Sequence, residues 1–142
     1  SGYGEDQDYS CPTPAIARRA VFKEAPFEVW GSGHQGRDFV HIDDVLDCIE
    51  LAMDKIHDGT AINIGQGVLT SFRELIALFC EFADYSPEIK PLLDKPVGVH
   101  SRYCDMTWVR ENLGWEPKIS IKEGMRRVYD AVIVREKQLG NL

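Results

Sequence analysis

The sequence predicts a small mixed α/β fold, and three observations lead to this class. The chain has 142 residues, a length close to that of a single domain. Its composition, 44% hydrophobic and 27% charged, is typical of globular proteins and not of disordered ones. Helical patterns alternate with short apolar runs bounded by glycine and proline. These runs are too short and too few to build a complete doubly wound sheet.

The first part of the chain is expected to hold one helix and two extended segments. Pro14 suits the first turn of a helix, and the alanines after it favour helix formation. Arg18 and Arg19 are expected on the solvated face of this helix or, alternatively, facing an anion. Pro26 interrupts the helix, and β-prone residues follow it. The expected elements are a loop at 1–12, a helix at 14–22, a strand at 27–30, a glycine-rich turn at 31–36 and an extended segment at 37–40.

A second helix is expected over residues 43–56. Asp43 is suited to cap its N-terminus, and Asp44 and Asp47 place negative charge where the helix dipole favours it. Apolar residues recur at helical spacing and form one stripe, which comprises Val45, Ile49, Ala52, Met53 and Ile56. Residues 60–64, which follow a glycine, are expected to form a buried strand.

Three further helices are expected in the remainder of the chain. Two of them begin with a capping box, formed by Ser71 with Glu74 and by Ser120 with Glu123. The helix between them stops at Gly114, and glycine is the residue type that most often ends helices. The expected bounds are 72–83, 105–113 and 121–138 for the helices, 87–93 for an extended segment and 94–101 for a loop.

Charge and cysteine usage exclude several classes of function. The net charge is −7 at pH 7, which argues against a general nucleic-acid surface. No run approaches the roughly 18 apolar residues of a membrane span, and no secretory signal is visible. Four cysteines lie far apart without a C-x-x-C pair, at Cys11, Cys48, Cys80 and Cys104. We therefore expect reduced thiols in a cytoplasmic protein that binds neither nucleic acid nor a membrane.

Two motifs match known ligand sites but are better explained as local structure. Gly31, Gly33 and Gly36 fit the G-x-G-x-x-G pattern of dinucleotide-binding loops. Such a loop needs a helix at its third glycine, so that helix amides meet the pyrophosphate, whereas β-prone residues follow Gly36. His41 and Asp43 are placed at a helix start, and no second cluster has metal-ligand spacing. We expect no cofactor at the glycine turn, no metal site and no catalytic triad.

Arg37 is the strongest candidate for a ligand contact on chemical grounds. It follows the glycine turn, and a guanidinium group binds phosphate through two parallel hydrogen bonds. Trp30 and Phe39 lie on the flanking extended segments and offer flat surfaces for a base. The alternative is a surface ion pair between Arg37 and Asp38 beside two core aromatic residues.

The order of several motifs is more specific than any one of them. Three segments follow one another: VWGSGHQGRDFVHIDDV, AINIGQGVLTSFREL and LGWEPKISIKEG. Tyr3 and Gly4 are similar to the end of an N-x-Y-G-P element. Together, these motifs resemble the C-terminal half of NAD-dependent nucleotide-sugar epimerases and dehydratases, which are extended short-chain dehydrogenase/reductases. The resemblance covers nearly the whole chain, to about residue 130.

The resemblance implies where a ligand binds. Arg37 matches the family arginine that holds the nucleotide diphosphate. Val29 and Trp30 match the strand that lies along the base, and Phe39 matches an aromatic residue near the nucleotide. The implied binding partner is a nucleoside diphosphate-sugar.

The resemblance also implies a second basic contact with the phosphates. Lys95 matches a position that is often occupied by such a ligand, and Arg102 is a rival candidate for the same role. Two positions depart from the family pattern. Ser1 stands where the family has an asparagine that contacts the substrate, and Glu5 replaces the proline after Tyr-Gly.

The catalytic parts of the family are not found in this sequence. The chain has no Tyr-x-x-x-Lys pair, since Thr107 and Ile133 stand four residues after Tyr103 and Tyr129. In the family, that pair and a glycine-rich NAD loop serve hydride exchange with NAD(P), the tyrosine acting as acid and base. The resemblance therefore implies that this chain alone binds no cofactor and has no catalytic residue, although NAD(P) serves the full-length enzymes.

Residues 1–142 are thus expected to form the substrate-binding part of an extended short-chain dehydrogenase, without the complete Rossmann domain. The chain would be a fragment or a truncated gene product, with segment 41–66 packing on the missing NAD-binding domain. The apolar stripe left exposed then favours a homo-oligomer. Two alternatives remain: a stand-alone module that binds a nucleotide, another phosphorylated ligand or a protein, and a remnant without function.

Overall fold

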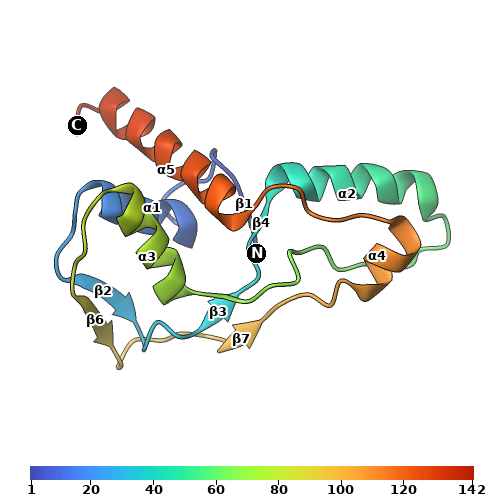
Figure 1. Cartoon of the computed structure of the whole chain (residues 1–142), viewed down its shortest axis with the longest axis horizontal. Helices are drawn as coiled ribbons and strands as arrows, with labels where there is room; N and C mark the ends of the chain where they lie inside the picture. Colours follow the sequence, from blue (N-terminus) through green and yellow to red (C-terminus); the bar gives the residue numbers. More distant parts are fainter.

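The protein has two lobes arranged along one long axis (Figure 1). The computed structural model describes every residue from Ser1 to Leu142. The mixed α/β class predicted from the sequence is confirmed. The helices of the larger lobe are α1 (Pro12–Val21), α3 (Phe72–Phe82) and α5 (Ile121–Gln138), and those of the smaller lobe are α2 (Ile42–Lys55) and α4 (Thr107–Leu113).

Seven short strands form three small sheets. β1 runs parallel to β4, and β2 runs parallel to β6. β3 lies between an antiparallel β5 and a parallel β7. The strands are β1 (Gly2–Tyr3), β2 (Phe27–Trp30), β3 (Gly36–Arg37), β4 (Val40–His41), β5 (Thr70–Ser71), β6 (Ile89–Leu92) and β7 (Ser101–Arg102). No sheet exceeds three strands, so a doubly wound sheet is absent, as the short apolar runs predict.

The larger lobe is built around one apolar core of 16 buried residues, to which α1, α3 and α5 contribute. Ser71 caps α3 in the predicted capping box, with both of its hydrogen bonds to Glu74 present. Ser120 caps α5 by accepting a hydrogen bond from the backbone N–H of Glu123 at 3.1 Å. Because these caps satisfy free backbone donors, they set the points where the two helices begin.

A buried carboxylate joins α1 to α5. The Glu136 side chain is completely buried and binds the Arg18 Nε at 2.9 Å, and the hydroxyl of Tyr9 donates to the same oxygen. Arg19 forms its own ion pair with Glu24, with 2.7 Å between Nε and Oε2. The two arginines are partly solvated, as expected, with 42% of the Arg18 side chain and 31% of the Arg19 side chain exposed, but carboxylates of α5 and of the segment after α1 bind both guanidinium groups.

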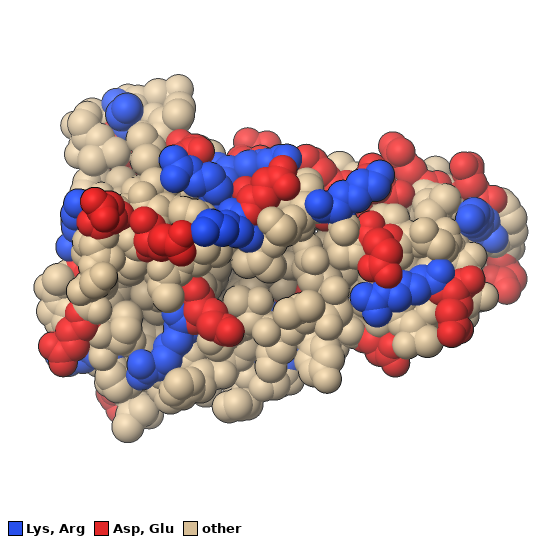
Figure 2. Space-filling view, in the orientation of Figure 1, with Lys and Arg blue, Asp and Glu red and all other residues tan.

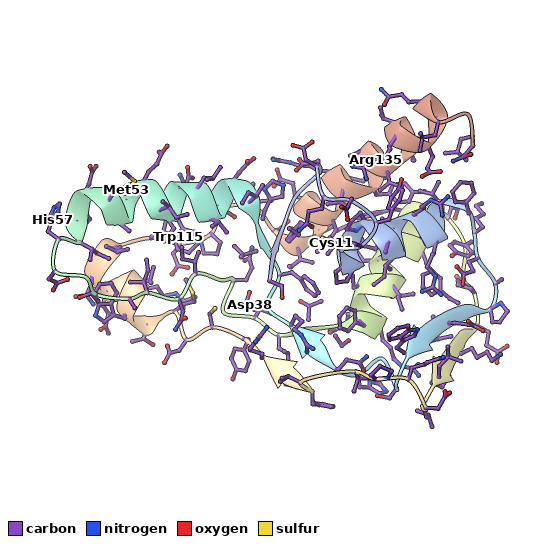
Figure 3. All side chains as sticks on the ribbon, turned by 180° about the vertical axis from the view of Figure 1, so that it is seen from behind. Cys11, Asp38, Met53, His57, Trp115 and Arg135 are labelled. Atoms are coloured by element: carbon purple, nitrogen blue, oxygen red, sulfur yellow. The ribbon has the colours of Figure 1, made fainter.

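The smaller lobe has its own core between α2 and α4. Figure 3 shows Trp115 lying between these two helices. Gly114, at φ 62°, ends α4 as the sequence predicts. Glycine suits this left-handed position because it has no Cβ to clash. The five buried residues of this core are Cys48, Met106, Val109, Leu113 and Trp115.

The apolar stripe expected on α2 is divided between two faces. Ala52 and Ile56 pack against the smaller core, whereas Ile49 is 42% exposed and Met53 is 70% exposed. Figure 3 shows Met53 on the side of α2 that faces away from α4. The division arises because α4 covers only one side of the helix. We define the outer stripe of α2 as the exposed residues Ile42, Leu46, Ile49 and Met53.

Two local predictions are corrected by the structure. Residues 60–64 form no strand, because no neighbouring strand supplies hydrogen-bond partners, although Ile62 and Ile64 still pack against the smaller core. α2 is capped by His41 and not by Asp43. The Nδ1 atom of His41 accepts a hydrogen bond from the backbone N–H of Asp43 at 3.1 Å.

The surface carries mixed charge. Figure 2 shows acidic and basic side chains interspersed over α5 and α2, with no large field of one sign on this face. All four cysteines are free, and Cys48 and Cys80 are buried, as expected for thiols on apolar helix faces. None of the helices combines the length and the apolar character that crossing a bilayer requires.

Candidate functional site

A cavity of about 430 Å³ lies in the larger lobe between α1, β2, β3 and the loop that leads to β7. We call it the β2–β3 cavity. Of the 14 residues on its wall, eight are hydrophobic. Val29, Trp30 and Arg37, three of the predicted site residues, line it together, and Pro96 and Val97 of the loop close one side. Mostly apolar walls with a few polar groups are typical of small-molecule sites.

Backbone carbonyls hold the Arg37 side chain in place. Its Nη1 donates to the carbonyl oxygens of Gly36 at 2.7 Å and of Val99 at 2.6 Å, and its Nη2 lies 3.5 Å from that of Val97. The guanidinium carbon lies 6.0 Å from the ring centroid of Phe72. These contacts occupy Nη1 and leave the Nε–H and one Nη2–H unused. That edge is the one that forms paired hydrogen bonds with an oxyanion.

Arg37 is also the one charged residue of the cavity wall without a carboxylate partner. The other, Arg19, binds both oxygens of Glu24 at 2.7 and 2.8 Å and the carbonyl of Glu28 at 2.6 Å. These hydrogen bonds lower the pKa of the Glu24 carboxyl, so this ion pair persists at neutral pH. The cavity therefore offers one uncompensated positive charge beside apolar and aromatic surface, which suits a phosphate ester that carries a flat ring.

Asp38 orders the backbone next to Arg37. Its buried carboxylate accepts hydrogen bonds from the backbone N–H groups of Gln66 at 2.7 Å, Gly67 at 3.0 Å and Cys104 at 3.1 Å. It thereby joins β3 to two distant loops. The alternative of a surface ion pair between Arg37 and Asp38 is wrong, because Asp38 points inward and Arg37 lines the cavity.

Phe39 does not reach the β2–β3 cavity. It is 2% exposed and packs edge-on against Tyr3 and Phe72 in the core, with ring centroids 6.5 and 6.1 Å apart. The extended segment expected at 37–40 is divided into β3 and β4, which pair with different strands. The side chains of residues 37–40 therefore do not alternate between two faces as they would along one continuous strand. Phe72, which the sequence argument did not select, supplies an aromatic ring on the wall.

The two rival basic residues lie outside the cavity wall. Lys95 is exposed in the loop beside Pro96, and Arg102 is exposed on β7. The register of the parallel pair places Arg102 directly beside Arg37 in the sheet. Paired residues of neighbouring strands have side chains on the same face. Arg102 is therefore a sheet neighbour of Arg37, whereas Lys95 lies in the loop before β7.

The glycine turn between β2 and β3 does not fit a cofactor loop. Gly36 begins β3 and not a helix, so no helix N-terminus faces the turn. Gly31 has φ +66°, and a Cβ there would collide with Val97, so the chain itself covers the turn. These residues therefore do not fit the pyrophosphate of NAD(P). No cluster of three or more His, Cys, Asp and Glu side chains is placed to hold a metal ion.

Sequence comparisons identify the family of the chain. A family model described as GDP-mannose 4,6 dehydratase matches residues 3–128. The putative GDP-L-fucose synthase 2 of Arabidopsis thaliana is 32% identical over 149 residues, covering 96% of this chain and 44% of that protein. The UDP-glucose 4-epimerase of Mycolicibacterium smegmatis is 32% identical, covering 90% of this chain and 42% of that protein.

Structural comparisons give the same result. The UDP-glucose 4-epimerase of Thermotoga maritima superposes with a TM-score of 0.80 at 32% identity, covering 97% of this chain and 44% of that one. The dTDP-glucose 4,6-dehydratase of Bacillus anthracis reaches a TM-score of 0.86 at 18% identity, which supports the fold alone. The fold and these relatives thus define an extended short-chain dehydrogenase/reductase, of which this chain matches a part.

The chain belongs to the family of NAD-dependent nucleotide-sugar epimerases and dehydratases. It spans less than half the length of the relatives named here.

Proposed function

We propose that this chain is the substrate-binding part of an NAD(P)-dependent nucleotide-sugar epimerase or dehydratase, and that the β2–β3 cavity holds the nucleoside diphosphate. The observation that carries this proposal is the state of Arg37. Its guanidinium group has no carboxylate partner, is held by carbonyl oxygens and keeps one edge free on the wall of an apolar cavity. A diphosphate supplies the paired oxygens that this edge needs.

Family membership supports a nucleotide-sugar as the ligand. The T. maritima relative, 32% identical to this chain, was solved with UDP-glucose. In this chain, the exposed Trp30 and the ring of Phe72 line the same cavity wall as Arg37. The base of the ligand would lie along β2 at Val29 and Trp30. Arg102, beside Arg37 in the sheet, would add charge attraction for the second phosphate, with Lys95 as its rival.

The chain would bind the substrate and leave the reaction to the rest of the enzyme. It carries no Tyr-x-x-x-Lys pair, and its glycine turn does not fit NAD(P). Hydride exchange would therefore depend on NAD(P) held outside residues 1–142. Segment 41–66 would pack on that cofactor-binding part, which would cover the outer stripe of α2. In the isolated chain, a second copy would cover the stripe.

Calorimetric titration of the purified chain with UDP, GDP and dTDP tests the proposal. We expect saturable binding of at least one of them at a single site, and no turnover of the corresponding sugar nucleotide. ATP and inorganic phosphate serve as controls for binding to charge alone. If none of the three diphosphates binds a folded chain, the proposed function is wrong, and a protein-binding module or a remnant explains the chain better.

A further inference from the structure

Gln35 presents a free hydrogen-bond acceptor to the β2–β3 cavity. Its residue is 5% exposed and lies on the cavity wall. The side-chain Nε2 of Gln35 donates to the backbone carbonyl of Trp30 at 2.7 Å. The backbone carbonyl of Gln35 accepts from the backbone N–H of Phe72 at 3.0 Å. No donor of the chain bonds to Oε1.

The orientation of this side-chain amide is fixed by its partner. A backbone carbonyl can only accept, so the amide nitrogen must face Trp30 and Oε1 must face the other way. Two buried side-chain polar atoms, the Tyr3 hydroxyl and the Trp115 Nε1, lack both a partner and contact with solvent. Oε1 of Gln35 has no partner either but is not one of them, so it keeps contact with solvent, and its residue lines the cavity.

The two charged side chains of the wall donate hydrogen bonds and cannot accept them. Arg19 and Arg37 are donors only. Oε1 of Gln35 is a side-chain acceptor of fixed orientation on the same wall, near the end of β2, where Trp30 is exposed. A Cβ built on Gly31 would lie 3.6 Å from this oxygen and would collide with Val97, so Oε1 lies beside the glycine turn where Val97 packs. An accessible acceptor in an apolar wall favours a ligand with an N–H or O–H at that point.

We propose that Gln35 determines nucleoside specificity by accepting a hydrogen bond from the nucleoside of a ligand whose diphosphate binds Arg37. This inference rests on the proposed function. The donor would be either the ring N–H of uracil, thymine or guanine, or a ribose hydroxyl. Cytosine and adenine carry an acceptor nitrogen at the corresponding ring position, so they would be rejected in the first case.

The experiment measures affinity ratios, which cancel losses common to all ligands. The probes are UDP against CDP, GDP against ADP, and UDP and GDP against their 2′-deoxy forms. We expect the wild-type chain to prefer UDP or GDP over a partner without the donor by roughly tenfold, the scale of one hydrogen bond. In Gln35→Met, which has similar length and no acceptor, that ratio should fall to about one. The comparisons of UDP with CDP and of GDP with ADP test the ring N–H, and the comparisons with 2′-deoxy forms test the ribose hydroxyl.

Two further variants distinguish specificity from structure. Gln35→Asn keeps both the amide donor and the acceptor on a shorter side chain and is expected to retain more of the preference than Gln35→Met, whereas Arg37→Ala should weaken all diphosphates by one common factor and leave the ratios unchanged. If Gln35→Met binds diphosphates with every ratio within about twofold of wild type, the proposal is overturned. Loss of preference in both Gln35 variants also overturns it, since the residue then acts through the fold. Failure of the wild-type chain to bind any diphosphate refutes instead the proposed function on which it rests.

Discussion

Replacing Arg37 by alanine is the sharpest test of the β2–β3 cavity. The unused edge of the guanidinium group can form two hydrogen bonds with a diphosphate, while Nη1 stays on the carbonyls of Gly36 and Val99. Hydrogen bonds to charged groups contribute about 1.5–3 kcal/mol. We therefore expect Arg37→Ala to weaken nucleoside diphosphate binding by roughly 10- to 150-fold.

Calorimetry of the wild type and four variants under one buffer condition measures this loss. Arg37→Lys keeps the charge but not the paired geometry, so its affinity should lie between those of wild type and Arg37→Ala. Lys95→Ala should cost less than Arg37→Ala, because an ammonium group contacts phosphate as a point charge. Arg110→Ala is the matched control, since Arg110 pairs with Glu116 on the smaller lobe and should leave binding unchanged.

The result that refutes the reasoning is specific. If Arg37→Ala keeps the thermal midpoint and the circular dichroism of wild type and still binds with wild-type affinity, Arg37 does not hold the ligand. An equal loss in Arg110→Ala would mean that binding follows overall charge and not this cavity. A large loss in Arg37→Ala with a lowered thermal midpoint calls for Arg37→Lys, which retains a donor for the carbonyls, to separate fold from binding.

Three other predictions concern stability, assembly and the cofactor. The ion pair with Arg18 and the hydroxyl of Tyr9 lowers the pKa of Glu136 to about 2, below its ordinary value of 4.5. The stabilisation from this carboxylate is therefore fully present above pH 4.5 and is lost as the pH falls towards 2. Acid denaturation of Glu136→Gln should lack that component. Identical acid denaturation profiles of wild type and variant would contradict this prediction. The outer stripe of α2 should make the chain self-associate at micromolar concentration, and Ile49→Asp should shift it towards monomer in sedimentation velocity. A wild-type monomer with a cooperative thermal transition would refute this expectation. The purified chain should contain no NAD(P). Stoichiometric cofactor in its absorbance spectrum would overturn the proposal that NAD(P) is held outside residues 1–142.

Local signals in the sequence determined the main helices and one site residue. The capping box at Ser71, the cap at Ser120 and the glycine at Gly114 fix helix ends through bonds within a few residues, so they can be read from the chain itself. The place of Arg37 after a glycine turn predicted a ligand contact, and the structure places this residue on the cavity wall. Motif order also identified the family, because several short segments at family-like spacing are specific together.

Tertiary structure decided what depends on distant partners. Arg18 and Glu136 are 118 residues apart, so no local pattern could predict that they bind each other. The Phe39 ring is in the core and the Phe72 ring is on the cavity wall because β3 and β4 pair with different strands.

The same reason explains the smaller lobe and the cavity. The periodicity of α2 established an apolar helix, but only the position of α4 determined that Ala52 and Ile56 are covered while Ile49 and Met53 are exposed. Residues 60–64 have the composition of a strand, yet a strand exists only where a neighbour supplies hydrogen bonds. Gln35 has no distinguishing signal in the sequence, since its free acceptor follows from the hydrogen bond that turns its nitrogen towards Trp30. Sequence by itself thus determined elements and family, whereas side-chain partners from distant segments determined which residues line the cavity.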